Sequence, residues 1–264
     1  MLIDSHCHVS TPRYEEDRDQ VLARAREAGL IALIDVGCDV ASSEASLALA
    51  RSSPMVFAAV GVHPHEAKFY DETTPDALRR MAADPRVVAI GEMGLDFHYD
   101  HSPRDVQRRV FRLQLELARS LDMPVVLHIR EAYEEGLALI DELNALPGPA
   151  LRGVSHCFTG NATQALGFSE RGFGVSFTGV VTFKKALDLQ EAARAIPLES
   201  VLVETDCPYM SPVPLRGKRC EPAFVVHTAR KVAELRGISE AELEAATVQN
   251  TIRVFGLPGD LGAS

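Results

Sequence analysis

The sequence predicts an α/β protein with a single (β/α)₈ barrel (TIM barrel) domain over residues 1–264. The chain has 264 residues, and such barrels typically run to about 250. Short apolar segments alternate with longer amphipathic segments in eight consecutive pairs, without a linker or an internal repeat. Residue types that bind metals end six of the eight apolar segments.

The eight expected strands are dense in apolar residues, as is typical of parallel strands buried on both faces. They are residues 2–6, 31–36, 55–61, 87–92, 124–128, 151–156, 173–177 and 201–205. No Gly-x-Gly-x-x-Gly segment follows the first strand, which argues against an open dinucleotide-binding sheet. A closed barrel is therefore favoured.

The helices are expected between the strands. They lie near residues 14–28, 42–53, 75–83, 103–122, 131–146, 161–171 and 183–195, with a longer helical tail over about 221–255. Gly29 stands where a glycine commonly ends a helix. Ser102 and Pro103 indicate an N-cap and a first-turn proline for the fourth helix. One apolar stripe is predicted along that helix, made by Val106, Val110, Leu113, Leu117 and Leu121.

Charge and hydropathy narrow the class of protein. The formal net charge of -10 argues against wrapping of long nucleic acid, but it is compatible with an enzyme that holds a few nucleotides around bound cations. No apolar segment approaches the roughly 20 residues that span a bilayer. The N-terminus does not resemble a secretory signal. We therefore expect a soluble cytoplasmic enzyme with no membrane contact and no obligate protein partner.

The five cysteines include no Cys-x-x-Cys pair, so a disulfide framework is not indicated. Cys7, Cys157 and Cys207 each follow a candidate metal ligand. Because neighbouring side chains of a strand face opposite ways, we expect these three to point towards the helices as small buried residues. Cys38 carries no clear signal.

Histidine and acidic residues lie at the carboxyl ends of the expected strands, which form one rim of a barrel where active sites lie. The His-x-His spacing of the first strand places two imidazoles on one side of an extended chain. Glu92 has two oxygens and can bridge two ions about 3.5–4 Å apart. The pattern predicts a site for two divalent metal ions made by His6, His8, Glu92, His128, His156 and Asp206.

Six blocks of sequence resemble the TatD-type deoxyribonucleases, in register from residue 3 to about residue 256. The blocks are residues 3–8 (IDSHCH), 61–65 (GVHPH), 90–96 (IGEMGLD), 127–132 (LHIREA), 155–160 (SHCFTG) and 204–209 (ETDCPY), the last followed by the basic run 216–219. The resemblance implies an amidohydrolase-type barrel and metal-dependent hydrolysis of nucleic acid, commonly 3′ to 5′ from single-stranded DNA ends. It implies metal binding by the same six residues and also places His63 and Glu204 at the site.

The resemblance implies Mg²⁺ as the usual activator, although imidazoles bind Zn²⁺ or Mn²⁺ more tightly. The sequence departs from the family at Cys220, where the usual residue is asparagine. A thiol cannot replace the two donors and one acceptor of an amide, so any hydrogen bond of that asparagine is in doubt.

Each site residue has an expected task. Asp206 binds an ion and accepts the proton of the attacking water, and Glu92 serves both ions. His63 contacts the scissile phosphate or holds the water, and Glu204 orients a ligand histidine. Basic residues that follow the last two strands are expected to bind phosphate: Lys184, Arg216, Lys218 and Arg219.

Two other functions stay open. The same two-metal site could serve a small-molecule amidohydrolase or esterase, or a deacylase such as one acting on D-aminoacyl-tRNA. Many amidohydrolases bridge two ions with a carboxylated lysine on strand four, where this chain has Glu92 and no lysine. A barrel that has lost catalysis and only binds a partner is disfavoured because no ligand is missing.

Overall fold

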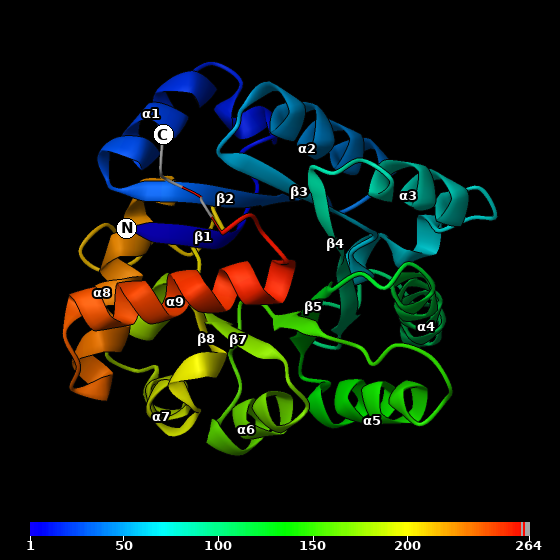
Figure 1. Cartoon of the computed structure of the whole chain (residues 1–264). Helices are drawn as coiled ribbons and strands as arrows, with labels where there is room; N and C mark the ends of the chain where they lie inside the picture. Colours follow the sequence, from blue (N-terminus) through cyan, green and yellow to red (C-terminus); the bar gives the residue numbers. More distant parts are fainter. Residues whose placement is uncertain (260, 262–264) are drawn as a thin grey trace.

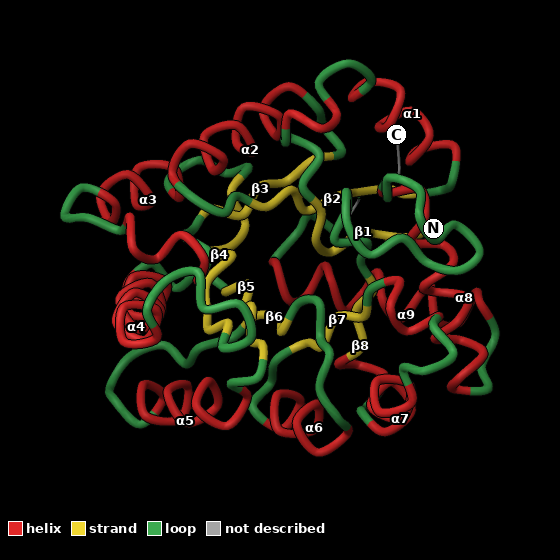
Figure 2. Tube along the Cα trace, turned by 180° about the vertical axis from the view of Figure 1, so that it is seen from behind, coloured by secondary structure: helices red, strands yellow, loops and turns green. Residues whose placement is uncertain are grey.

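The computed structural model describes residues 1–259 and 261 and confirms the predicted (β/α)₈ barrel. Eight parallel strands form one sheet in sequence order, with the helices around its outside (Figures 1 and 2). The strands are β1 (Leu2–Cys7), β2 (Leu30–Val36), β3 (Val56–Val60), β4 (Val87–Asp96), β5 (Val125–Arg130), β6 (Gly153–Ser155), β7 (Gly174–Phe177) and β8 (Val201–Val203).

The seven helices expected between strands are all present. The α-helices are α1 (Arg18–Glu27), α2 (Val40–Ser52), α3 (Thr74–Ala82), α4 (Arg104–Ser120), α5 (Tyr133–Asn144), α6 (Ala162–Glu170), α7 (Leu187–Ala195), α8 (Val225–Arg236) and α9 (Glu240–Phe255). Short 3₁₀ helices are η1 (Pro12–Tyr14), η2 (Pro64–Phe69), η3 (Gly179–Thr182), η4 (Leu198–Ser200) and η5 (Pro222–Phe224). No helix in these described residues is long and apolar enough to cross a membrane.

The expected helical tail is two helices. Gly237 follows α8 in a left-handed conformation with φ 67°, which turns the chain before α9 begins. Helix α9 then lies beside the amino-terminal ends of β1 and β8 (Figure 1). Asn250 donates from Nδ2 to the carbonyl oxygens of Leu198 and Val201, both at 2.8 Å. One continuous helix could not cover the barrel in this way.

Two details of α4 were predicted wrongly. Ser102 is not its N-cap, because Pro103 holds that position and the Ser102 hydroxyl donates to the carbonyl of His65 at 2.7 Å. Leu113 is exposed, so it does not belong to the buried stripe. Gln107 and Gln114 are buried on this helix instead, because the loops at the barrel rim leave backbone groups that their amides satisfy.

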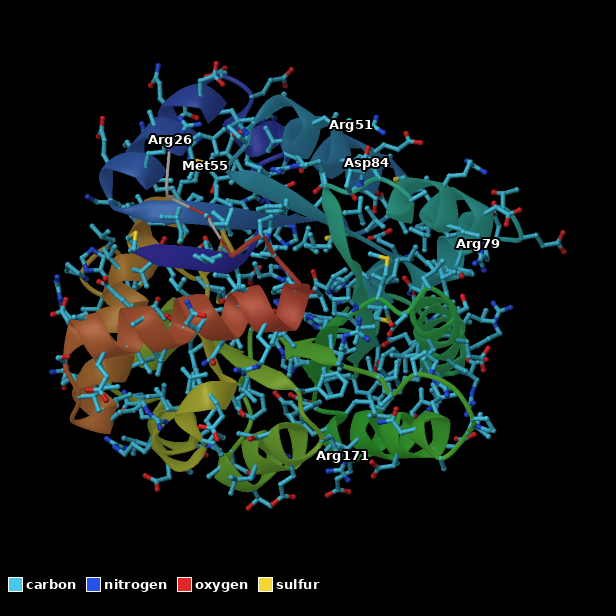
Figure 3. The ribbon with its side chains drawn as sticks, in the orientation of Figure 1. Arg26, Arg51, Met55, Arg79, Asp84 and Arg171 are labelled. Carbon is cyan, nitrogen blue, oxygen red and sulfur yellow. The ribbon has the colours of Figure 1, made fainter. Side chains whose placement is uncertain are left out.

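The prediction that a glycine ends the first helix is confirmed. Gly29 follows α1 with φ 85°, a left-handed backbone that glycine adopts without steric cost. Around the barrel, ion pairs at the surface join neighbouring helical segments. Arg51 of α2 pairs with Asp84 just after α3 (Figure 3), and Arg171 just after α6 pairs with Asp141 of α5. Such exposed pairs contribute at most about 1 kcal/mol each. The two apolar cores, inside the barrel and between sheet and helices, therefore dominate its stability.

The barrel closes at the residues that carry the predicted site. The Asp206 amide donates to the His6 carbonyl at 3.0 Å, and the His8 amide donates to the Cys207 carbonyl at 2.9 Å. Asp4 of β1 accepts from the Thr205 amide at 2.9 Å. These bonds continue the β1–β8 contact beyond the end of β8, so closure of the sheet also positions the predicted ligands.

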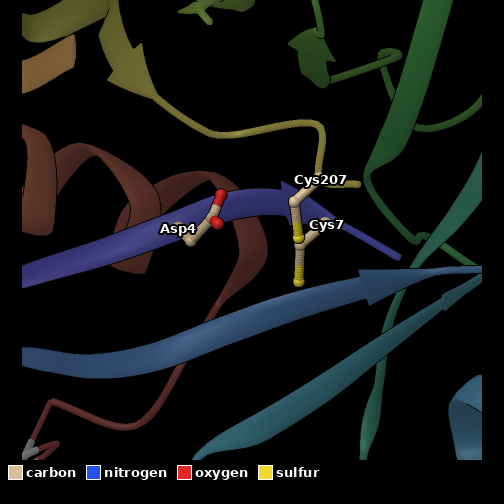
Figure 4. Close-up of side chains that lie close together, drawn as sticks. All are labelled: Asp4, Cys7 and Cys207. Atoms are coloured by element: carbon tan, nitrogen blue, oxygen red, sulfur yellow. The ribbon is translucent and has the colours of Figure 1, made fainter. Parts of the chain in front are cut away.

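The cysteine prediction is confirmed for two residues and wrong for one. Cys7 and Cys207 are fully buried and lie close together next to Asp4, between β1 and the segment after β8 (Figure 4). Cys157 is only partly buried. It follows the end of β6 with φ 41°, so the alternation of a strand does not apply to it.

At Gly94 the backbones of β4 and β5 lie too close together to leave room for a side chain. Its φ is 150°, and a Cβ there would overlap the carbonyl oxygen of His128. Gly29 also has a positive φ, but nothing lies within 4 Å of its Cβ position. We expect Gly29→Ala to lower the free energy of unfolding by about 1–2 kcal/mol. Gly94→Ala should lower it by about 3 kcal/mol or more, because overpacking adds to the backbone strain.

Urea denaturation of the two variants measures this difference. Equal losses of stability would show that β4 and β5 can separate at this point without cost.

Candidate metal centre

Glu92 stands between two groups of side chains at the carboxyl end of the barrel, and each of its carboxylate oxygens faces one group. Oε2 lies 3.4 Å from Nε2 of His6 and 3.9 Å from Nε2 of His8. Oε1 lies 2.7 Å from Nε2 of His156 and 3.0 Å from Nδ1 of His128. The side chain of Glu92 is 3% exposed, so these imidazoles surround its carboxylate in place of water.

The first group consists of His6, His8, Asp206 and Oε2 of Glu92. Oδ1 of Asp206 lies 3.5 Å from Nε2 of His8 and 3.9 Å from Nε2 of His6. The two imidazole nitrogens are 3.2 Å apart. This group therefore offers two nitrogens and two carboxylate oxygens from three strand ends.

The second group consists of His128, His156 and Oε1 of Glu92, with His63 beside them. Nδ1 of His128 and Nε2 of His156 are 3.2 Å apart. Nε2 of His63 lies 3.3 Å from Oε1 of Glu92, as close as the nitrogens expected to bind metal. His63 therefore stands beside the second group, but its Nδ1 accepts from the His65 amide at 3.1 Å, so in the neutral ring Nε2 carries the proton and has no lone pair for a metal.

The two groups fit divalent cations. Ligand atoms about 2.1 Å from one tetrahedral ion lie roughly 3.4 Å from each other, close to most of these spacings. In both groups two imidazole nitrogens face each other, and one cation between them would satisfy both lone pairs. Both groups combine imidazole and carboxylate, a donor set suited to Zn²⁺ or Mn²⁺ and compatible with Mg²⁺.

Charge within the site favours cation binding. Burial would raise the pKa of Glu92, but the imidazoles of His156 and His63 hold it well below its usual value. Burial would also raise the pKa of Asp206, but the imidazoles of His8 and His6 hold that pKa below its usual value. Burial lowers the pKa of His63 to about 4. At neutral pH both carboxylates are thus charged and His63 is neutral.

Asp96 positions the second group, and sequence reasoning gave it no role. Its Oδ2 accepts from Nε2 of His128 and from Nε2 of His65, both at 3.0 Å. Its Oδ1 accepts from the amides of His98 and Tyr99. Because Nε2 of His128 holds the proton of this bond, Nδ1 is left with the lone pair that faces Glu92.

The signal for Asp96 was present but lay beyond the expected end of the strand. β4 continues to Asp96, four residues after the predicted last residue, Glu92. Residues two and four apart on a strand share a face, so Asp96 follows Glu92 on the same side. Cys38, after β2, was also missed, and its Sγ lies 3.9 Å from Oε2 of Glu92.

Other buried polar residues hold the segments that carry the ligands. Oε1 of Glu204 accepts from the Cys157 amide at 2.6 Å and lies 3.3 Å from Nδ1 of His156, where an orienting carboxylate is expected. The amide of Gln114 pairs with the backbone of Val62, directly before His63, at 2.7 and 2.9 Å. These contacts fix backbone that would otherwise move with the loops.

The predicted phosphate-binding residues differ in their surroundings. Lys184 and Lys218 are exposed. Arg216 lies over the ring of Phe183, 4.2 Å from its centroid. Arg219 is paired with Asp17 and lies over Tyr14, so part of its charge is already neutralised.

Cys220, at the position where asparagine is usual, is a core residue. It is fully buried among apolar side chains, and burial raises the pKa of its thiol well above the usual range. Its amide donates to the carbonyl of Pro208 at 3.3 Å, and its carbonyl accepts from the hydroxyl of Tyr14. Backbone groups thus supply polar contacts here.

The chain is similar to known proteins over nearly its whole length. A family model described as TatD related DNase matches residues 3–256. An uncharacterized metal-dependent hydrolase, YabD, of Bacillus subtilis is 37% identical, over 97% of this chain and 99% of its own. The 3′-5′ ssDNA/RNA exonuclease TatD of Escherichia coli is 36% identical over the same shares. The crystal structure of YJJV, a TatD homologue from Escherichia coli, superimposes with a TM-score of 0.91 at 29% identity, covering 97% of this chain and 98% of that one.

The contacts of Asp96 lead to a prediction. Asp96→Asn should weaken binding of the ion in the second group by about 10–100-fold. An amide has one oxygen, so its NH₂ must face either the two imidazole N–H groups or the two backbone amides, and that pair of donors loses its acceptor. Asp100→Asn, in the exposed loop nearby, is the matched control. Titration of the chelator-treated protein with Mn²⁺ or Zn²⁺ measures the affinity, and a loss equal to that of the control would remove Asp96 from a positioning role.

Proposed function

The chain belongs to the TatD-related DNase family of metal-dependent hydrolases, and on that premise we propose that it removes nucleotides from single-stranded nucleic-acid ends in the 3′ to 5′ direction. The observation that carries this proposal is Glu92, whose two oxygens face two separate groups of ligand atoms. Support for the substrate comes from the exonuclease relatives, which act on single-stranded DNA and RNA by their names.

Two divalent cations are proposed as cofactors. We assign His6, His8 and Asp206 to one ion, His128 and His156 to the other, and Glu92 to both, from the atoms that face each Glu92 oxygen. His156 also lies within reach of His6 and Asp206, so it stands where the two groups meet. When bound, the ions would polarise a phosphoryl oxygen and lower the pKa of the attacking water towards neutrality. Mg²⁺ is proposed in function, with Zn²⁺ or Mn²⁺ as tighter-binding substitutes.

Asp206 is proposed as the group that accepts the proton of the attacking water. Its lowered pKa keeps it charged at neutral pH, and its side chain is 11% exposed, so one edge reaches the open side of the site. An ionised carboxylate at hydrogen-bond distance from the water is what general-base catalysis requires.

His63 is proposed to contact the scissile phosphate, or to hold the attacking water, from the side of the second group. Its Nδ1 accepts from the His65 amide at 3.1 Å, which assigns the proton to Nε2 in the neutral ring. An Nε2–H directed into the site can donate to a phosphoryl oxygen. Glu204 is proposed to orient His156.

Lys184, Arg216 and Lys218 are proposed to attract the phosphates of the strand beyond the cleaved bond. They are exposed and follow β7 and β8 at the rim of the barrel. Arg219 is proposed for the same role, although it must share its charge with Asp17.

Digestion of end-labelled single- and double-stranded DNA and RNA, with each divalent metal in turn, tests the function. We expect single-stranded substrates to be shortened from the 3′ end, with complete loss of activity in excess chelator and recovery on addition of metal. Cyclic amides and D-aminoacyl esters serve as comparison substrates. Hydrolysis of these without any cleavage of oligonucleotides would overturn the nuclease assignment.

A substitution separates proton transfer from metal binding. Asp206→Asn should keep at least one ion, through the histidines and Glu92, but reduce single-turnover cleavage by about 100-fold or more, because an amide does not accept the proton. Asp188→Asn, exposed on α7, is the control. Elemental analysis gives the metal content. Retention of both ions with near-normal cleavage would mean that Glu204 or His63, and not Asp206, accepts the proton of the attacking water.

A further inference from the structure

A pocket of about 450 Å³ opens beside the first ligand group, and of the six proposed metal ligands it is lined by His8. Three segments form it. They are the residues after β1 from His8 to Pro12, the end of β2 with the first turns of α2, and Pro208 with Tyr209 after β8. Its volume exceeds that of one nucleobase and suits a single nucleoside-sized group.

The pocket is continuous with the metal centre through His8. His8 lines the pocket, and its Nε2 lies 3.5 Å from Oδ1 of Asp206. Nδ1 of the same ring is held by the carbonyl of Val36 at 2.7 Å, which fixes the ring between the two spaces. A group in the pocket is thus within reach of a phosphate at the metal centre.

The chemistry of the walls favours a flat neutral ligand. Val36, Pro12, Ala41, Ala45 and Pro208 present apolar surface. Tyr209 lines the pocket and is 49% exposed, so its ring can stack on a base.

Charge makes the pocket unsuitable for phosphate. Among the described residues that line it, none is lysine or arginine. The charged residue there is Asp39, whose carboxylate caps α2 by accepting from the Ser42 amide at 2.7 Å. An anion would meet this negative charge without a compensating cation. The phosphate of a ligand therefore belongs at the metal centre, and its uncharged part belongs in the pocket.

We propose that this pocket binds the base of the terminal nucleotide, so that the strand end is anchored while its phosphate lies at the metal centre. The inference rests on the proposed function for its substrate class. Ser10 and Thr11 line the pocket, and their hydroxyls would bind polar groups at the edge of the base, while the Tyr209 ring would cover one of its faces. Arg13 lies over the Tyr209 ring, 5.1 Å from its centroid, and adds positive charge outside the pocket towards the rest of the strand.

Binding tests the pocket without requiring cleavage. Calorimetry compares thymidine 5′-monophosphate with 2-deoxyribose 5-phosphate, which lacks the base, in the metal-loaded protein. We expect the nucleotide to bind about tenfold more tightly, as one stacked base provides. Ala45→Phe fills the pocket from an exposed position of α2 and should reduce this ratio to near one. Ala48→Phe, exposed one turn further along α2, should keep the ratio of the wild type.

Cleavage provides the second measurement. An oligonucleotide whose terminal nucleotide lacks its base should be cut with a kcat/KM about tenfold lower than the ordinary end, and Ala45→Phe should remove the difference. Equal binding of nucleotide and sugar phosphate by the wild type, or an unchanged ratio in Ala45→Phe, overturns the pocket. Preference for the nucleotide without cleavage of any oligonucleotide overturns the proposed function but supports the pocket.

Discussion

The constraint on which the rest of the structure depends is the burial of the Glu92 carboxylate among imidazoles from several strands. A charged group withdrawn from water is tolerated only when cations or hydrogen-bond donors surround it. Here each oxygen meets its own set of histidine nitrogens, which arrive from the ends of β1, β5 and β6 and from the segment after β3. The barrel must therefore hold these strand ends in fixed relative positions.

A second layer of buried polar residues supplies that rigidity. Asp96 accepts a hydrogen bond from His128, and Glu204 lies beside the ring of His156. Asp4 accepts from the amide of Thr205, just before Asp206. Gln114 reaches from α4 to the segment before His63. Each of these links a ligand to a different element of the barrel. The orientation of each ligand is thereby tied to the packing of the whole domain and not to its own loop alone.

The candidate metal centre and the pocket beside His8 differ in charge. The metal centre concentrates carboxylates and imidazoles, which suit cations and, through them, phosphate. The neighbouring pocket offers apolar walls and one exposed aromatic ring, which suit a base. His8 divides the two, so a nucleotide could use both at once. This arrangement makes a net charge of -10 compatible with the proposed nucleic-acid substrate, because a few local contacts would replace an extended basic surface.

The sequence by itself determined the eight strands, the barrel and which residues gather at its rim, because parallel strands carry their carboxyl ends to one side whatever the loops do. Tertiary structure decided what depends on contacts between distant segments. The extension of β4 to Asp96, the burial of Gln107 and Gln114 and the exposure of Leu113 all follow from neighbours that local periodicity does not encode. The pocket beside His8 arises in the same way, since its walls are separated by up to about 200 residues of chain and meet only when the barrel closes.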